Sequence, residues 1–245
     1  HVQMKEIRAR EERMGLPPKR HIDTGYGVIE HLRTAYEQME QVPHDRPQIL
    51  IAPSWQKDNI LDSCIDPLLR QLLAEDRYNV IVRPHPEWIK RFPQRREAFE
   101  ARHKAELDAG RFVFQTDFSS GDTVYQSDLL ITDWSTIAME FSFTTCKPSL
   151  YINTPMKVMN PNYKELPMEP LDITLRDQLG RSVALDAVGS TAGQAVADLL
   201  ADADGYRERI DKLVYELMPN FGHSGEIGGK YILRSLQEKI QKRKD

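Results

Sequence analysis

The sequence has little of several things that would decide its class at once. Only two cysteines occur in 245 residues, Cys64 and Cys146, and they lie far apart without a nearby cluster of ligand residues. A disulfide framework and a zinc site are therefore both disfavoured, and we expect a reducing compartment. The chain has no run of about 18 apolar residues and its opening segment lacks the apolar centre of a signal peptide. We expect a cytoplasmic protein.

An excess of charge of one sign is also missing. The 33 lysines and arginines nearly balance 37 aspartates and glutamates, which gives a formal net charge of −4 and a pI near 6.0. No global field draws such a chain to nucleic acid, and we expect no nucleic-acid partner. What the chain does have is 40% apolar residues, over a length that can form one large domain or two small ones. The composition predicts a globular protein.

Several catalytic motifs are absent as well. There is no Walker lysine motif and no strand-linked GxGxxG, which disfavours a P-loop ATPase and a nicotinamide enzyme. HExxH is missing, and no serine lies in a GxSxG elbow, which weakens a hydrolase interpretation. No acidic metal cluster is visible, and we expect neither a metal nor a separate cofactor.

Five apolar runs of strand length alternate with stretches of helical composition. The runs are apolar on both faces, as in a parallel sheet that is covered on each side. The alternation predicts βαβ units in an α/β fold with a doubly wound, mostly parallel sheet. The predicted strands are residues 48–52, 79–82, 111–114, 128–132 and 148–152, and the predicted helices between them are 60–75, 87–109 and 136–143.

The flanking segments are predicted in less detail. Residues 21–26 suggest a short strand and turn, followed by a helix over 28–41. Residues 153–170 hold four prolines and predict a long loop, and such loops are often functional. Three helices complete the predicted chain, over residues 190–203, 206–218 and 226–242.

In a doubly wound sheet, ligands bind outside the carboxyl ends of the strands. The tetrapeptide RPHP follows the second predicted strand directly and puts His85 at such an end, in a turn fixed by two prolines. A histidine held this way can donate a hydrogen bond to a phosphate or neutralise part of its charge. The alternative is a turn histidine that bonds a backbone carbonyl. Arg83 is a second candidate, although an arginine beside a sheet also commonly pairs with an acid.

The stretch DLLITDWST, residues 128–136, ends a predicted strand on an acid and two hydroxyls. Asp133, Ser135 and Thr136 are all ordinary helix N-cap residues. Only one residue can occupy the cap, however, and exposed amides with two hydroxyls form a cradle for a phosphate. We therefore predict a phosphate site here, with capping as the alternative. Glu140, one turn further along, is placed to reach a ribose hydroxyl or else is a solvated helix residue.

Two further segments carry candidate contacts. Ser54 and Lys57 belong to a donor-rich loop after the first predicted strand, in which Trp55 is either a stacking surface or a buried anchor. The glycine-rich stretch PNFGHSGEIGG, residues 219–229, precedes the last predicted helix. Its His223 and Ser224 are candidates for a second phosphate contact, and the alternative is a plain turn between helices.

Taken together, GY near the start, APSW, RPHP, SDLLITDWST and the late FGHSG resemble the CDP-glycerol glycerophosphotransferase family. Its members polymerise or prime teichoic acids and related capsular polymers. The resemblance covers about residues 21–240. It implies the Rossmann-like, nucleotide-binding C-terminal half of a GT-B fold.

By this resemblance His85 matches a histidine that contacts the pyrophosphate of the donor. Ser135 and Thr136 match a hydroxyl pair directed at its phosphate, and Asp133 matches the acid ahead of that pair. The implied reaction is in-line attack by an acceptor hydroxyl on the β-phosphorus of a CDP-alcohol, most simply CDP-glycerol, with release of CMP. His85 would be the catalytic residue, because it would stabilise negative charge on the departing phosphate.

The same resemblance implies that an N-terminal half holds the acceptor, a lipid-linked polymer, and a histidine that acts as base. The chain opens on His1 with a polar segment. We therefore expect a fragment, in which residues 1–20 are a linker or remnant of that half and residues 21–245 form the donor-binding domain. Family members act at the cytoplasmic face of the membrane, where the basic tail QKRKD could support a peripheral contact.

Other functions remain open at this point. In a GT-B glycosyltransferase that uses a UDP-sugar, the same residues would hold the pyrophosphate while chemistry occurred at the anomeric carbon. A nucleotide-sugar epimerase-like protein of the same architecture is a further alternative, behind the glycosyltransferase. A noncatalytic nucleotide-binding or polymer-assembly scaffold is the alternative from another class of protein.

Overall fold

The computed structural model describes residues 2–243, and within them six parallel strands form one sheet in the order β3-β2-β1-β4-β5-β6. Strands are added outward in both directions from the two central strands, β1 and β4, as in a doubly wound fold. The prediction of an α/β fold with a parallel sheet is confirmed. The strands are β1 Gln48–Ile51, β2 Asn79–Val82, β3 Val113–Phe114, β4 Leu129–Thr132, β5 Ser149–Asn153 and β6 Gly180–Ala184.

The central strands are the ones with the most uniformly apolar sequences. Every residue of β1 and β4 is buried, and β1 pairs with β2 on one side and β4 on the other. Burial on both faces explains why these runs lack the alternation of a half-exposed strand. All five predicted strands are present, within two residues at each boundary.

The sixth strand, β6, was not predicted. Its sequence GRSVA carries too few apolar residues to stand out, because β6 lies at the edge of the sheet and only part of it is buried. It pairs with β5 along its whole length. Gly180 is required at its start, since a Cβ there would lie 1.7 Å from the carbonyl oxygen of Ser149.

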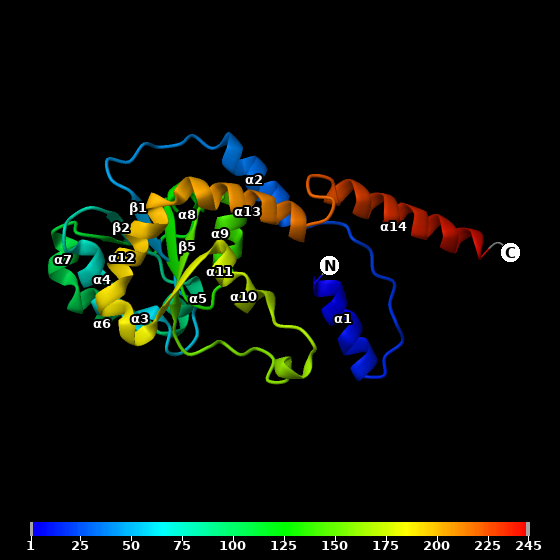
Figure 1. The fold of residues 1–245 in the computed structure, drawn as a ribbon, viewed down its shortest axis with the longest axis horizontal. Helices are drawn as coiled ribbons and strands as arrows, with labels where there is room; N and C mark the ends of the chain where they lie inside the picture. The colour runs from blue at the N-terminus through cyan, green and yellow to red at the C-terminus, as the bar shows by residue number, and fades with distance from the viewer. Residues whose placement is uncertain (1, 244–245) are drawn as a thin grey trace.

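Helices cover both faces of the sheet (Figure 1). One face packs mainly against α4 and α12, and the other against α2, α9 and α13. Two hydrophobic cores result, one on each side. The helices are α1 Val2–Arg13, α2 Gly27–Gln38, α3 Ile60–Ser63, α4 Ile65–Leu73, α5 Pro86–Arg91, α6 Pro93–Arg102, α7 Lys104–Asp108, α8 Asp122–Gln126, α9 Ile137–Thr145, α10 Leu171–Thr174, α11 Arg176–Leu179, α12 Val188–Ala201, α13 Ala203–Leu217 and α14 Ser224–Gln241.

Two long predicted helices are broken in the structure. The predicted helix over 60–75 is interrupted at Cys64, whose φ of −153° is not helical. The predicted helix over 87–109 divides into α5, α6 and α7, with breaks at Phe92 and His103. Phe92 precedes Pro93, and a residue before proline is pushed out of the helical region. The sequence predicted the helical character of both segments correctly, but it did not predict these local breaks.

The predicted strand over residues 21–26 was wrong. The segment joins α1 to α2 outside the sheet and has no regular structure. His21 lies beside the buried carboxylate of Glu11 in α1, with 3.5 Å between Nε2 and Oε1. Gly25 has a φ of +97° and lies against Pro219 and Ser224. These packing contacts, and not strand pairing, fix the segment.

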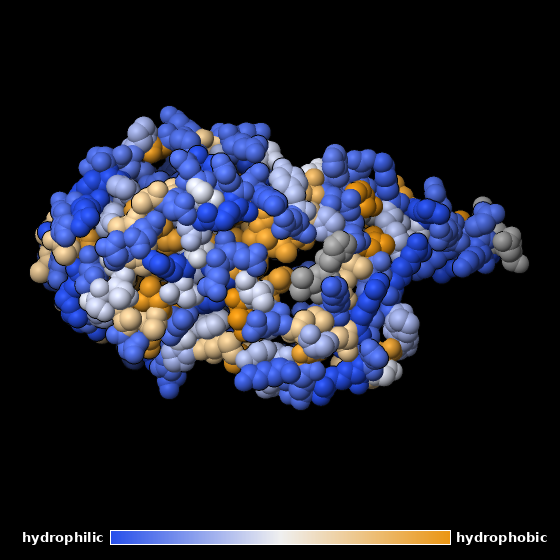
Figure 2. All heavy atoms as spheres, viewed as in Figure 1, coloured by the Kyte–Doolittle hydropathy of each residue, from blue (hydrophilic) through white to orange (hydrophobic). Residues whose placement is uncertain are grey.

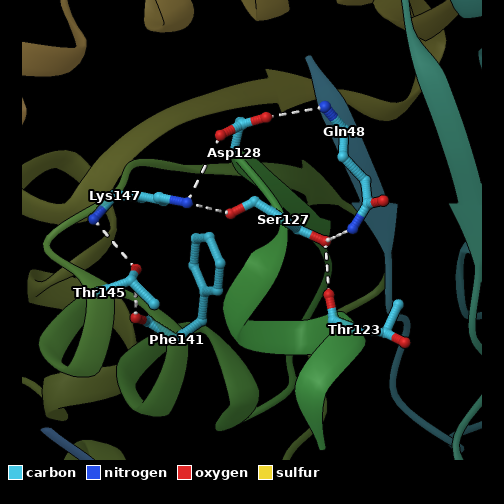
Figure 3. Close-up of polar contacts among 7 residues, drawn as sticks. All are labelled: Gln48, Thr123, Ser127, Asp128, Phe141, Thr145 and Lys147. Atoms are coloured by element: carbon cyan, nitrogen blue, oxygen red, sulfur yellow. Dashed lines mark hydrogen bonds and ion pairs between the residues drawn. The ribbon is translucent and has the colours of Figure 1, made fainter. Parts of the chain in front are cut away.

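A polar network holds the amino edge of the sheet together (Figure 3). Asp128, just ahead of β4, accepts the backbone N–H of Gln48 at 2.9 Å and lies 3.4 Å from the ammonium of Lys147. That ammonium also donates to the carbonyl oxygen of Ser127 at 2.8 Å. Burial lowers the pKa of Lys147, and Asp128 opposes this effect. The polar groups at the amino edge therefore bond to one another and hold the fold together.

Helix α14 extends away from the main body (Figure 1). Four of its hydrophobic residues are exposed on one face, namely Ile232, Leu233, Leu236 and Ile240. Elsewhere most of the surface in view is hydrophilic, with hydrophobic residues in scattered patches (Figure 2). Among residues 2–243, no helix is both long enough and apolar enough to span a bilayer.

Candidate functional site

The carboxyl ends of β1, β2, β4 and β5 bring their following loops to one edge of the sheet. The loop after β1 touches the loop after β5, because Gln56 Nε2 donates to the carbonyl oxygen of Pro155 at 2.9 Å. Trp134, after β4, reaches the same loop and donates from Nε1 to the carbonyl oxygen of Thr154 at 2.8 Å. His85, after β2, lies 6.5 Å from Trp55 between ring centres, so four strand ends contribute to one surface, which we call the strand-end edge.

Asp133 is a buried organiser of this edge. Its side chain is 1% exposed, and Oδ1 accepts the N–H of Ser54 at 2.8 Å and of Trp134 at 2.7 Å. Oδ2 accepts the N–H of Ile60 at 3.2 Å. Backbone donors to an ionised carboxylate are strong hydrogen bonds. With both oxygens engaged in this way, Asp133 fixes the loop after β1 against the end of β4.

The first turn of α9 has unused donors. Thr136 occupies the N-cap position, but its side chain makes no capping hydrogen bond. Within the described chain, the N–H groups of Ser135, Thr136 and Ile137 have no acceptor, and neither hydroxyl is bonded. Ser135 is half-buried and Thr136 is exposed. Unpaired amides at a helix N-terminus, next to two hydroxyls, form an arrangement that suits an anion.

Glu140 lies one turn further along α9 and is half-buried. Burial raises the pKa of its carboxyl group. In residues 2–243 no ion pair involves this carboxylate. Glu140 is thus available as a hydrogen-bond acceptor close to the first turn of α9.

His85 is the N-cap of α5, and its ring geometry fixes its tautomer. Nδ1 accepts the backbone N–H of Glu87 at 3.0 Å, so in the neutral ring Nε2 carries the proton. Burial lowers the pKa of His85, and the positive charge of Lys157 lowers it further while Glu87 opposes both. The ring is half-buried at the end of β2. Near neutral pH His85 is an N–H donor.

Arg83 is tied to the loop after β3. One terminal nitrogen donates to Gln115 Oε1 at 2.8 Å and the other to the carbonyl oxygen of Ser120 at 3.0 Å. Its guanidinium also lies 5.2 Å from the centre of the Phe118 ring. Burial lowers the pKa of Arg83, against the effect of Asp117. The side chain is half-buried, and it connects two loops at this edge.

Ser54 and Lys57 differ in their surroundings. Ser54 is 1% exposed, and its hydroxyl is buried without a hydrogen-bond partner in the described chain. Lys57 is exposed to solvent, two residues before Asn59 caps α3. Both belong to the loop that Asp133 holds in place.

His223 and Ser224 belong to a different contact. The Ser224 hydroxyl donates to Glu30 Oε2 at 2.7 Å, and its N–H donates to Glu30 Oε1 at 3.3 Å. Glu30 is in α2, so this pairing attaches the start of α14 to α2. His223 is exposed and lies 3.6 Å from Glu226. Within residues 2–243, no hydrogen bond or ion pair joins either residue to the strand-end edge.

Arg176 is a residue of this edge that the sequence did not reveal. It is 5% exposed and donates to the carbonyl oxygen of Asp133 at 2.9 Å and to Asn153 Oδ1 at 2.8 Å. Its guanidinium lies 4.1 Å from the Trp134 ring centre and 4.5 Å from that of Tyr151. Burial lowers its pKa, while Tyr151 and Asp133 raise it. In the sequence, its burial is indicated only by its place between Leu175 and Leu179, which lie four residues apart.

A small cavity of about 20 Å³ lies behind the first turn of α9, between Ser135, Trp134 and Arg176. No carboxylate lies within 4.0 Å of the Arg176 guanidinium in the described residues, so its charge is met by carbonyl oxygens and aromatic rings. Asp133 and Asp172 line the same cavity and raise the pKa of Arg176 against the effect of burial, so the buried cation lies among acids, with the unpaired amides of α9 beside it. Among residues 2–243, no three His, Cys, Asp or Glu side chains are grouped so as to hold a metal.

A family model described as CDP-Glycerol:Poly(glycerophosphate) glycerophosphotransferase matches residues 18–156, more than half of the 245-residue chain. The matched stretch contains β1 to β5, His85 and the first turn of α9. A search among curated proteins gave no match.

Several solved structures resemble the chain. A UDP-forming alpha,alpha-trehalose-phosphate synthase from Burkholderia vietnamiensis has a TM-score of 0.53 at 12% identity, covering 87% of this chain and 50% of that one. The N-terminal domain of a Candida albicans trehalose-6-phosphate phosphatase has a TM-score of 0.50 at 13% identity, covering 85% and 47%. The wall teichoic acid polymerase TagF has a TM-score of 0.44 at 16% identity, covering 97% and 50%.

The first two likenesses confirm the fold, a doubly wound α/β domain of the GT-B type, and at such low identity they concern the fold alone. The chain spans about half the length of these solved structures.

Proposed function

The chain belongs to the CDP-glycerol:poly(glycerophosphate) glycerophosphotransferase family, and we propose that it binds the CDP-alcohol donor of a glycerophosphate transfer. The observation that carries the proposal is the first turn of α9, where three N–H groups and two hydroxyls have no partner in the described chain. His85 supports it from the neighbouring strand end as a neutral N–H donor. These groups suit a diphosphate, because all of them are donors.

The proposed reaction transfers glycerol phosphate from CDP-glycerol to a hydroxyl. The acceptor oxygen attacks the β-phosphorus, which carries the glycerol, and forms a new phosphorus–oxygen bond. The bond from that phosphorus to the bridging oxygen breaks, and its electron pair leaves with CMP. The acceptor's proton passes to a base, which we assign to the acceptor-binding part of the whole protein. No cofactor beyond the donor enters this scheme.

Catalysis in this scheme comes from donors that meet charge as it develops. Negative charge grows on the bridging oxygen and the departing phosphate as the bond breaks. A fixed N–H at His85 Nε2 and the first-turn donors of α9 would stabilise that charge more than the charge of the ground state. His85 is therefore the proposed catalytic residue, with Ser135 and Thr136 as phosphate ligands.

The remaining site residues have supporting roles in the proposal. Glu140 would accept a hydrogen bond from a ribose hydroxyl, since its half-buried carboxylate lies one turn from the phosphate ligands. Asp133 would act through the loop after β1, because its oxygens are occupied by backbone N–H groups. Ser54 would act through the loop after β1, because its hydroxyl is buried, and Arg83 and Lys57 would contribute positive charge. His223 and Ser224 are left out of the donor site, because Ser224 is bonded to Glu30.

Acceptor recognition is assigned to the whole protein, because the chain spans only about half the length of the solved structures it resembles. We propose a lipid-linked polymer as acceptor and a location at the cytoplasmic face of the membrane. Both follow from the family alone. The basic end of α14 would support a peripheral contact with anionic lipid.

Calorimetric titration of the chain with CDP-glycerol, CDP-ribitol, CMP, UDP-glucose and ATP tests the proposal. We expect CDP-glycerol to bind more tightly than UDP-glucose and ATP. Tighter binding of UDP-glucose would favour a glycosyltransferase. Absence of binding by every cytidine nucleotide would contradict the donor-site proposal.

A further inference from the structure

Trp55 is surrounded by positively charged side chains at the strand-end edge. The Arg91 guanidinium lies 4.9 Å from the centre of its ring and the Lys157 ammonium lies 5.4 Å from it. The His85 ring centre is 6.5 Å away. Three different segments supply these groups: the loop after β1, helix α5 with its cap, and the loop after β5. The cluster therefore exists only because the fold brings these segments together.

Lys157 makes no ion pair within 4.0 Å in the described part of the chain. Arg91 is paired with Glu87 at 2.7 Å, but among the described residues no carboxylate lies within 4.0 Å of the Lys157 ammonium. Asp172 is near enough for Lys157 to lower its pKa, although burial outweighs this effect and the pKa is raised. Lys157 also lowers the pKa of His85. The charge of Lys157 therefore acts on His85, and an anion near both would be attracted by the ammonium and accept the His85 N–H.

The position of Lys157 is set by its own loop. Pro155, two residues earlier, accepts the hydrogen bond from Gln56 that joins the two loops. Lys157 is half-buried, and its aliphatic stem can lie along the Trp55 ring while the charged end stays accessible. Such a lysine is held near His85 without being enclosed.

We propose that Lys157 is a phosphate-binding residue of the donor site, and that it pairs with the same diphosphate as His85. The inference rests on the proposed function for the identity of the donor, but the cationic cluster around Trp55 stands without it. A compact ammonium suits this role, because it can approach a phosphate oxygen from any direction. Lys157 would thereby add a full positive charge where His85, neutral, supplies only a hydrogen bond.

The test compares Lys157→Gln, Lys157→Arg and Lys164→Gln by calorimetric titration with CDP-glycerol, inorganic pyrophosphate and cytidine. Lys164 is the matched control, because it belongs to the same loop, is exposed and lies 5.9 Å from an aromatic ring, that of Tyr163. We expect Lys157→Gln to weaken CDP-glycerol and pyrophosphate binding about tenfold and to leave cytidine binding unchanged. Lys157→Arg should stay within about threefold of the wild type.

Equal affinities in Lys157→Gln and Lys164→Gln would overturn the inference. Loss of cytidine binding in Lys157→Gln would overturn it too, since it would indicate a disturbed loop. If the wild type binds pyrophosphate through Lys157 but not CDP-glycerol, the inference stands and the proposed donor is wrong. If the wild type binds neither phosphate compound, both proposals fail.

Discussion

His85 is held by a single hydrogen bond that determines its chemistry. Because Nδ1 accepts the N–H of Glu87, the proton of the neutral ring is on Nε2. Burial keeps the ring neutral by lowering its pKa. RPHP indicated a rigid histidine at a strand end, and the structure adds which nitrogen carries the proton. The sequence could not show this, because it depends on the turn into α5.

Binding of an anion should raise the pKa of His85, so below neutral pH the bound ring takes up a proton that the free ring does not, and Nδ1 then no longer accepts the N–H of Glu87. Affinity for CDP-glycerol should therefore increase as the pH falls from about 7.5 to about 5.5, because the diphosphate itself does not titrate in this range. In His85→Gln, which keeps an N–H donor but cannot titrate, the affinity should vary little with pH. His85→Ala should bind about tenfold more weakly than the wild type.

Calorimetry across this pH range measures the effect, with His31→Gln as control because His31 is an exposed histidine of α2. A pH dependence that is identical in the wild type and His85→Gln would show that His85 does not contact the anion.

Arg176 shows what residue patterns leave out. Arg176 begins α11 and packs between Trp134, just after β4, and Tyr151 in β5. It therefore links three elements through tertiary contacts. Nothing within a few residues of Arg176 in the sequence points to Asp133 or Asn153. Burial of a cation in this way is costly unless it is well bonded, so its two carbonyl and amide acceptors are essential to its position.

At the scale of the element, the first turn of α9 distinguishes capping from ligand binding. Neither hydroxyl of Ser135 and Thr136 bonds the protein, so replacing both by Ala should change the melting temperature little. The same double variant should weaken CDP-glycerol binding about tenfold or more, because it removes two donors from a charged ligand.

A control for the affinity exists in α12, where Ser190 and Thr191 are adjacent, exposed hydroxyls that both donate to the carbonyl oxygen of Ala187. Ser190→Ala with Thr191→Ala should leave the affinity for CDP-glycerol unchanged. If the α9 double variant loses thermal stability and keeps its affinity, Ser135 and Thr136 serve the helix and not a ligand. Thermal melting and calorimetry on both variants give the comparison.

The strands show how far the sequence predicts elements of this fold. β1 and β4 were predictable because full burial makes them continuously apolar. β6 was not, because an edge strand needs little apolar sequence and is held by its pairing with β5. The same reasoning applies to the site: the strand ends that carry His85 and Ser135 follow from the sheet order, whereas the contact of Ser224 with Glu30 depends on helix packing beyond the sheet.

At the scale of the whole molecule, the distribution of charge matters more than its sum. The net charge of −4 would not attract an anionic donor. The strand-end edge nevertheless gathers Lys157, Arg176 and the unpaired amides of α9, and in the described residues neither cation has a carboxylate within 4.0 Å. Local fields of this kind control ligand binding at short range. The amino edge contrasts with it, because its lysine is bonded into a network with Asp128.

In the proposed complex, a CDP-alcohol places its diphosphate on the first turn of α9, beside His85. Amide NMR spectra recorded during titration with CDP-glycerol test it most directly, because every residue involved contributes its own signal. We expect the largest shifts from the N–H groups of Ser135, Thr136 and Ile137, together with the Nε2 signal of His85. Saturable shifts confined to other parts of the chain, or no shifts at all, would contradict it.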